Sequence, residues 1–143
     1  MVDLLRKSEA FISQLSLVAI VDDQIVGYIL FSKIYIVDDQ GNRTPSIALA
    51  PVAVLPQFQK QGIGTQLIER GLSDARVLNF KSAVVLGHPT YYPKFGFVKA
   101  EKWSIKAPFD VPSEAFMAIE LVENTLQGIA GTVEYPKEFQ EVS

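Results

Sequence analysis

Two stretches of the chain contain residues that could bind a ligand or take part in catalysis. Gln59 to Thr65 reads Gln-Lys-Gln-Gly-Ile-Gly-Thr and stands between an apolar strand and an apolar-striped helix. Glycines let backbone amides approach a bulky anion, and the start of a helix offers unpaired N–H groups with a favourable dipole. The pattern therefore predicts a phosphate cradle, to which Lys60 adds a charge and Thr65 a hydroxyl. A tight strand-to-helix turn without a ligand explains the same glycines, because short glycine patterns recur by chance.

The second stretch places an imidazole and a phenol after the next apolar strand. His88 ends that strand, and Tyr92 follows it. A phenol with a pKa of about 10 is protonated at neutral pH and can donate a proton, while imidazole titrates where a general base works best. The alternatives are that Tyr91 and Tyr92 are core aromatics with surface hydroxyls, and that His88 has a polar structural role.

Two other phosphate motifs do not fit the glycine stretch. A P-loop needs Lys and then Ser or Thr after its last glycine, whereas Gly64 is followed by Thr65 and Gln66. A dinucleotide fingerprint needs a third glycine where Leu67 stands, and a carboxylate at the end of the next strand, which here ends in Gly87-His88. The cradle is therefore of another kind.

The composition excludes several classes of site. The chain has 143 residues, which fits a single domain over 1–143. It has no cysteine and one histidine, so disulfides, thiolate nucleophiles and Cys- or His-rich metal sites are not expected. A net charge of −3 offers no basic surface to nucleic acid, and no apolar run is long enough to cross a membrane. The first residues lack the apolar core of a secretory signal, so a cytoplasmic location is expected.

Hydrophobic periodicity predicts the elements that position these residues. Residues 2–14 show a loose helical stripe, and a second stripe predicts a helix of about four turns from near Gly62. Gly27 indicates a bulge or a close backbone approach, and Pro51 a place where its strand parts from a neighbour. Strands are expected at 16–21, 25–37, 46–55, 83–86, 97–98, 115–122 and 131–135, with a turn at 22–24, a hairpin connection at 38–42 and an antiparallel meander of the first three.

In this order the two stretches resemble the GNAT superfamily of acyl-CoA-dependent N-acetyltransferases, over about Leu15 to Leu121. The resemblance is nearest to small bacterial members with Gly-Asp/His-Pro-x-Tyr-Tyr-Pro-x-Phe-Gly-Phe, here Gly87 to Phe97. It implies the α+β GNAT fold, a central mixed and mostly antiparallel sheet with flanking helices. It also implies that the glycine loop wraps the CoA pyrophosphate and that the preceding strand binds the pantetheine arm. The cofactor-binding residues so implied are Val52, Ala53, Val54, Gln59, Lys60, Gln61, Gly62, Ile63, Gly64 and Thr65.

The resemblance implies a reaction as well. An acetyl group would pass from acetyl-CoA, as co-substrate, to a primary amine of a small molecule or a protein, without a metal. Tyr92 stands where the family has the proton donor to the leaving thiolate, and backbone N–H groups near Val54 would polarise the thioester. His88 stands where members often have aspartate, so base and structural roles both stay open. Trp103 and Phe109 would line an acceptor pocket or serve the core or an interface.

The chain departs from the family at its start. The usual first strand and helix have no counterpart there, so residues 16–21 are expected to form an uncovered sheet edge. A second copy in a homodimer, or C-terminal residues 131–142, would cover that edge. The same departure keeps a second function open, a CoA- or acyl-CoA-binding module without catalysis.

Overall fold

The computed structural model describes residues 3–6 and 16–135. They form two compact units: unit 1 comprises Met1–Ser32 and Leu49–Asn79, and unit 2 comprises Lys33–Ala48 and Phe80–Ser143. Two long strands contribute residues to both units. The strands, in chain order, are β1 (Asp3–Arg6), β2 (Ser16–Val21), β3 (Gln24–Val37), β4 (Arg43–Val54), β5 (Ser82–Leu86), β6 (Val98–Lys99), β7 (Ile105–Lys106), β8 (Phe116–Glu120) and β9 (Gly131–Glu134).

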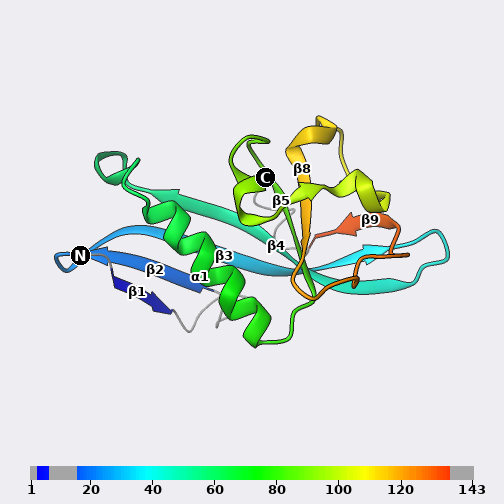
Figure 1. The fold of residues 1–143 in the computed structure, drawn as a ribbon, viewed down its shortest axis with the longest axis horizontal. Helices are drawn as coiled ribbons and strands as arrows, with labels where there is room; N and C mark the ends of the chain where they lie inside the picture. The colour runs from blue at the N-terminus through cyan, green and yellow to red at the C-terminus, as the bar shows by residue number, and fades with distance from the viewer. Residues whose placement is uncertain (1–2, 7–15, 136–143) are drawn as a thin grey trace. The chain divides into compact units, whose positions relative to one another are not determined.

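One α-helix, α1 (Ile63–Val77), occurs among the described residues, with short 3₁₀ turns between the strands (Figure 1). The turns are η2 (Pro56–Phe58), η3 (Tyr92–Phe95), η4 (Ala100–Trp103) and η5 (Ser113–Ala115). The sheet is mixed: β4 with β5 and β7 with β9 are parallel, whereas β1 with β2, β2 with β3, β3 with β9, and β8 with both β5 and β6 are antiparallel. The fold class is α+β, as expected.

In unit 1, a tight turn joins β2 to β3. Asp22 and Asp23 occupy it with φ of 50° and 66°, a left-handed conformation that aspartate tolerates better than most residues. The pairing register then slips, because Ala19 faces Gly27 while Ile20 faces Ile25. Such a slip is a β-bulge, and it confirms one of the two roles expected of Gly27.

Gly27 also has the second expected role, a close backbone approach. A Cβ atom at this position would lie 2.9 Å from the Ala53 carbonyl oxygen and 3.4 Å from Leu67. Beside it, the Val26 carbonyl accepts a hydrogen bond of 2.8 Å from the Leu55 N–H. The bulge therefore holds the end of β4, the segment that leads into the glycine loop.

The outer edge of β2 is paired within the chain. Strand β1 runs antiparallel to β2, with Asp3 opposite Ile20 and Arg6 opposite Leu17. The expected helix over 2–14 is therefore wrong at residues 3–6, and the rest of that prediction lies largely outside the described residues. The expectation of an uncovered β2 is wrong as well. A sparse apolar pattern of four residues cannot distinguish a helix from a strand when the pairing partner lies ten or more residues away.

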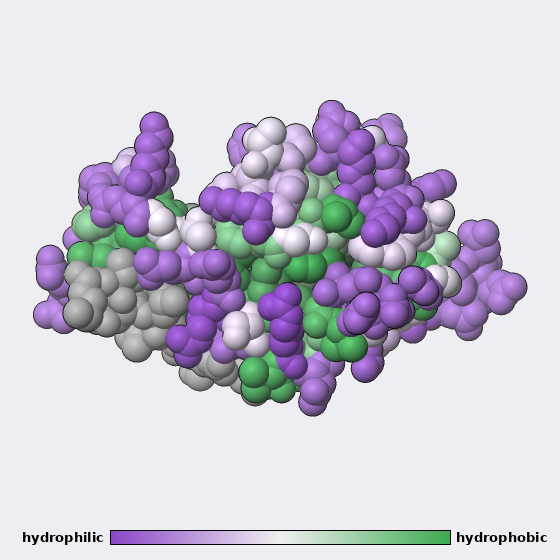
Figure 2. Space-filling view, in the orientation of Figure 1, coloured by the Kyte–Doolittle hydropathy of each residue, from purple (hydrophilic) through white to green (hydrophobic). Residues whose placement is uncertain are grey.

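Helix α1 packs one face against β2 and β3 (Figure 1). Gly71 lies against the Phe31 ring, which is 3.0 Å from where a glycine Cβ would be. The opposite face of the helix is largely hydrophilic (Figure 2). The buried residues of the helix include the apolar stripe that the sequence predicts: Ile63, Leu67, Ile68, Leu72 and Ala75.

Unit 2 is built on β5 and β8, and the first four residues of each strand are buried. Strand β5 pairs in parallel with β4, Ile47 opposite Ala83, and Ser46 shares a buried hydroxyl–hydroxyl bond of 2.8 Å with Ser82. One apolar cluster, the unit 2 core, fills the unit. Its members are Ile34, Ile36, Ala48, Val84, Ala100, Ile105, Phe116, Ala118, Leu126, Val133 and Tyr135.

The last strand, β9, lies where the sequence predicts a strand, but it pairs with β3 and not with β2. Residues Thr132 to Glu134 of β9 pair with Tyr35 to Val37 of β3, and Ile105 of β7 pairs with Gly131. The described part of the C-terminal segment therefore pairs with β3 in unit 2, and the edge of β2 is paired with β1 instead. The short strand β7 lies between the strands expected at 97–98 and 115–122, and its two residues give no sequence signal of a strand.

Candidate active site

The glycine loop joins β4 to α1 inside unit 1, and its side chains brace it. The Gln59 side-chain amide donates a hydrogen bond of 3.0 Å to the Val54 carbonyl, and the Gln61 amide donates one of 3.3 Å to the Gln57 carbonyl. Val52 and Val54 are half-buried, and Ala53 is exposed. The Gln59 side chain therefore ties the loop to the strand end, a role that the sequence pattern does not reveal.

The backbone of the loop turns through the left-handed region twice. Lys60 has φ of 65°, and Gly62, the residue before the helix, has φ of 82°. A Cβ atom at Gly62 would meet nothing within 4 Å, so glycine is needed there for its conformation. The open space beside Gly62 is compatible with the predicted phosphate cradle.

The start of α1 has the features of an anion site. The first hydrogen bond of the helix runs from the Gln66 N–H to the Gly62 carbonyl, 3.0 Å long. No side chain caps this end, and its first turn has no acidic residue. The helix therefore contains no carbonyl placed to accept a hydrogen bond from the amides of Ile63, Gly64 and Thr65. The dipoles of these amides favour a negative ligand. Lys60 and Gln61 are exposed beside them.

Tyr92, in unit 2, is held by tight packing on a glycine. Its side chain is 7% exposed, and a Cβ atom on Gly87 would lie only 2.4 Å from Tyr92 Cε2. The Tyr92 ring also meets the rings of Tyr91 and Phe97 edge to face, with centroids 5.2 Å and 5.8 Å away. Burial, with a smaller contribution from Tyr91, raises the pKa of Tyr92 above its usual value of 10.0. The phenol is therefore protonated over the physiological range.

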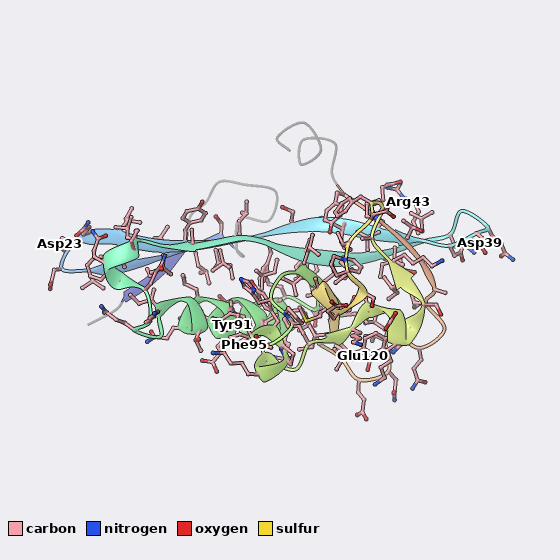
Figure 3. The ribbon with its side chains drawn as sticks, turned by 90° about the horizontal axis from the view of Figure 1, so that it is seen from above. Asp23, Asp39, Arg43, Tyr91, Phe95 and Glu120 are labelled. Carbon is pink, nitrogen blue, oxygen red and sulfur yellow. The ribbon has the colours of Figure 1, made fainter. Side chains whose placement is uncertain are left out.

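His88 shapes the turn that carries Tyr92. Its carbonyl accepts hydrogen bonds from the N–H groups of Tyr91, at 3.2 Å, and Tyr92, at 3.4 Å, while its imidazole is exposed. The Lys94 ammonium lies 4.2 Å above the Tyr91 ring, and Tyr91 meets Phe95 edge to face at 5.3 Å (Figure 3). The backbone of His88 thus has a structural role, which leaves its side chain accessible for another.

The two aromatic residues expected at an acceptor pocket have different environments. Trp103 is half-buried against the unit 2 core. Phe109 is 49% exposed and stacks on Tyr135, with centroids 6.1 Å apart and ring planes 16° apart. Gly87 had no role in the sequence analysis, although it is the first residue of the Gly87 to Phe97 pattern, and Tyr135 had none beyond a place in an expected strand.

Comparison with known proteins identifies the family. A family model for the acetyltransferase (GNAT) domain matches residues 13–99, more than half of the chain. The chain belongs to the GNAT family. It is an acetyltransferase of the α+β GNAT fold, as the resemblance implied, and the matched span contains the glycine loop, His88 and Tyr92.

Proteins similar to this GNAT chain support its assignment to the family. The uncharacterized N-acetyltransferase YhbS of Escherichia coli K12 is 34% identical over 126 residues, which are 87% of this chain and 74% of YhbS. The crystal structure of E. coli YhbS in complex with CoA has a TM-score of 0.79 at 32% identity, over 87% of this chain and 68% of that one. A GNAT acetyltransferase from Brucella melitensis in complex with acetyl-CoA has a TM-score of 0.66 at 35% identity, over 87% and 67%.

Two classes of feature do not occur among residues 3–6 and 16–135. No group of three or more His, Cys, Asp or Glu side chains is placed to hold a metal ion. No helix in this part of the chain is long and apolar enough to cross a membrane. All the candidate cofactor-binding residues lie in unit 1, and Tyr92 and His88 lie in unit 2.

Proposed function

We propose that this GNAT chain transfers an acetyl group from acetyl-CoA to a primary amine of a small molecule or a protein. The observation that carries the proposal is the uncapped start of α1, preceded by Gly62 in the left-handed region with open space above it. Two similar structures were determined with CoA and with acetyl-CoA, which supports CoA as the ligand of this loop.

In this proposal the amides of residues 62–65 bind the pyrophosphate, and Lys60 and Gln61 flank it. Gln59 contributes by holding the loop to Val54 through its side-chain amide. The backbone of Val52, Ala53 and Val54 binds the pantetheine arm. Because the Leu55 N–H is already bonded to Val26, we assign the thioester contact to the strand residues before it.

Tyr92 is the proposed general acid. The amine nitrogen forms a bond to the thioester carbonyl carbon, the carbon–sulfur bond breaks, and the leaving thiolate takes the phenolic proton. The proton that the nitrogen loses goes first to a base and then, by way of solvent, restores the phenol. The exposed imidazole of His88 is the proposed acceptor of that proton, with water as the alternative.

Thermal melting tests the cofactor part of the proposal directly. Acetyl-CoA at 100 times its Kd should stabilise the folded chain by about 2.7 kcal/mol, whereas ATP and NAD at equal concentration should not. Equal effects of all three ligands, or none from acetyl-CoA, would contradict the assignment of the loop.

A second function, a CoA-binding module without catalysis, predicts the same melting shift but no acetylated amine. Product formation with a panel of primary amines, followed by mass spectrometry, separates the two. A cytoplasmic location remains part of the proposal, on the sequence grounds given above. A homodimer is proposed only through a surface other than the edge of β2, which β1 occupies, and light scattering tests it.

A further inference from the structure

The turn after β5 places a lysine over aromatic rings beside the proposed acid. The Lys94 Nζ atom lies 4.2 Å from the centroid of the Tyr91 ring and 5.4 Å from that of Phe95, the two rings labelled in Figure 3. We propose that Lys94 is a positioning residue: its ammonium fixes the Tyr91 ring, and Tyr91 in turn holds the Tyr92 phenol in place. This inference rests on the proposed acid role of Tyr92. All of its residues belong to unit 2.

The backbone of the turn accounts for this stacking. Residues Tyr92–Phe95 form the 3₁₀ turn η3, and side chains three residues apart lie one above the other in such a turn. The Lys94 N–H donates a hydrogen bond of 3.4 Å to the Tyr91 carbonyl, three residues before it. The Lys94 side chain is therefore directed over the Tyr91 ring by the turn itself.

Tyr91 is a wall of the Tyr92 environment that burial alone does not fix. The Tyr92 ring lies on Gly87, and the rings of Tyr91 and Phe97 meet it edge to face. Phe97 is 1% exposed and is held by the core, whereas Tyr91 is half-buried. A partly exposed side chain changes rotamer more freely than a buried one. The orientation of the Tyr91 ring therefore depends on the contacts that it makes at the surface.

Lys94 supplies such a contact. No carboxylate of residues 3–6 and 16–135 forms an ion pair with its ammonium. A cation within about 6 Å of an aromatic centroid is attracted by the negative face of the ring. The ammonium lies over both Tyr91 and Phe95, and these two rings meet edge to face at 5.3 Å. Because the attraction is electrostatic, a neutral side chain of similar length cannot replace it.

The first experiment follows the ring signals of Tyr92 by NMR in the whole chain. Lys94→Gln removes the charge and should shift these signals, whereas Lys94→Arg keeps a cation that stacks on rings and should leave them close to those of the parent. Lys102→Gln is the matched control, because Lys102 lies over a different ring, that of Trp103, at 5.2 Å. Unshifted Tyr92 signals in Lys94→Gln, or equal shifts in Lys102→Gln, would overturn the inference.

The second experiment measures acetylation of the fastest substrate in the panel of primary amines. Lys94→Gln should lower kcat by about two- to fivefold, the range expected for the loss of one cation–π contact, and leave the KM for acetyl-CoA unchanged. Lys94→Arg should restore kcat, and Lys102→Gln should not change it. An unchanged kcat in Lys94→Gln would overturn the positioning role and leave the transferase proposal intact. If the parent chain acetylates no amine, the transferase proposal fails, and the NMR signals still decide whether Lys94 holds the Tyr92 ring.

A double variant shows whether Lys94 acts through the Tyr92 phenol. Tyr92→Phe has no phenolic proton to position, so adding Lys94→Gln to it should lower kcat no further. The same fall in both backgrounds would place the effect of Lys94 elsewhere and overturn the inference. Because Lys94 is exposed, its single variants should melt within about 2 °C of the parent, so that a fall in kcat does not reflect unfolding.

Discussion

The chemistry proposed for unit 2 depends on a contact between Tyr92 and Gly87. The Tyr92 ring is buried and lies on the Gly87 backbone, and this burial raises the pKa of the Tyr92 phenol. A phenol held in this way suits the proton-donor role proposed for it. The ring is positioned by packing against Gly87, Tyr91 and Phe97, so Tyr92 and Gly87 can both be tested by small changes.

Tyr92→Phe removes the phenolic proton and keeps the ring. We expect kcat to fall by about 100-fold or more, within the range for loss of a general acid. Acetyl-CoA affinity, measured by calorimetry, should be unchanged, because the proposed cofactor residues lie elsewhere. Because burial raises the pKa of Tyr92 above 10.0, the midpoint of any loss of wild-type activity through its ionisation should lie above pH 10. Unchanged kcat in the variant would remove Tyr92 from the mechanism.

Gly87→Ala tests the contact between Gly87 and the Tyr92 ring. The added methyl carbon would lie 2.4 Å from Tyr92 Cε2, so the ring must move although Tyr91 and Phe97 pack against it. We expect a loss of about 1–3 kcal/mol in the free energy of unfolding, together with a fall in kcat. In a Tyr92→Ala background the same substitution should cost little, because the ring is absent. Urea unfolding of the four chains measures the coupling.

At the scale of elements, the turn from β4 into α1 is the proposed cofactor site. The end of β4 lies against the bulge in β3, and the Gln59 side chain ties the glycine loop to Val54 by a hydrogen bond. The uncapped helix start follows directly. The whole segment lies within unit 1, so its binding activity can be judged apart from the chemistry of Tyr92.

Gly62→Glu places a negative side chain at this helix start. Gly128→Glu is a matched control, since Gly62 and Gly128 have φ of 82° and 78° and each has nothing within 4 Å of a Cβ. Both variants should lose similar stability through backbone strain, about 1–2 kcal/mol. Only Gly62→Glu should lose the melting shift with acetyl-CoA. A retained shift in Gly62→Glu would argue for a simple turn and against a cradle.

At the scale of the whole molecule, the alkaline limit of stability is expected to depend on buried tyrosines. Burial raises the pKa of Tyr135 from 10.0 to about 12. The folded chain therefore holds this proton more tightly than the unfolded chain does. The resulting stability is fully present below pH 10 and is lost as the pH rises toward 12.

Tyr135→Phe should flatten that pH dependence. In the parent chain we expect this group to account for a loss of about 2–3 kcal/mol between pH 10 and pH 12. Urea unfolding at pH 8, 10 and 12 gives the slopes, and Tyr28→Phe, an exposed tyrosine, is the control. Equal slopes in the two variants would contradict the burial of the Tyr135 phenol.

Most elements of this chain follow from local pattern. The turns at 22–24 and 38–42, the strand at 16–21 and the apolar stripe of α1 are predictable, because each depends on residues close in sequence. The side chain of Asp38 accepts hydrogen bonds from the amides of Gln40 and Asn42, so that hairpin is built from its own residues. The glycine loop and the paired tyrosines, read in order, were also sufficient to indicate the family.

Tertiary structure alone decided the features that depend on distant neighbours. The pairing of β1 with β2 and the completion of β3 by β9 each join segments whose own sequences do not specify a partner. Local periodicity determines which face of an element is apolar; only the folded chain determines what that face meets, because pairing and packing energies arise between residues far apart in sequence.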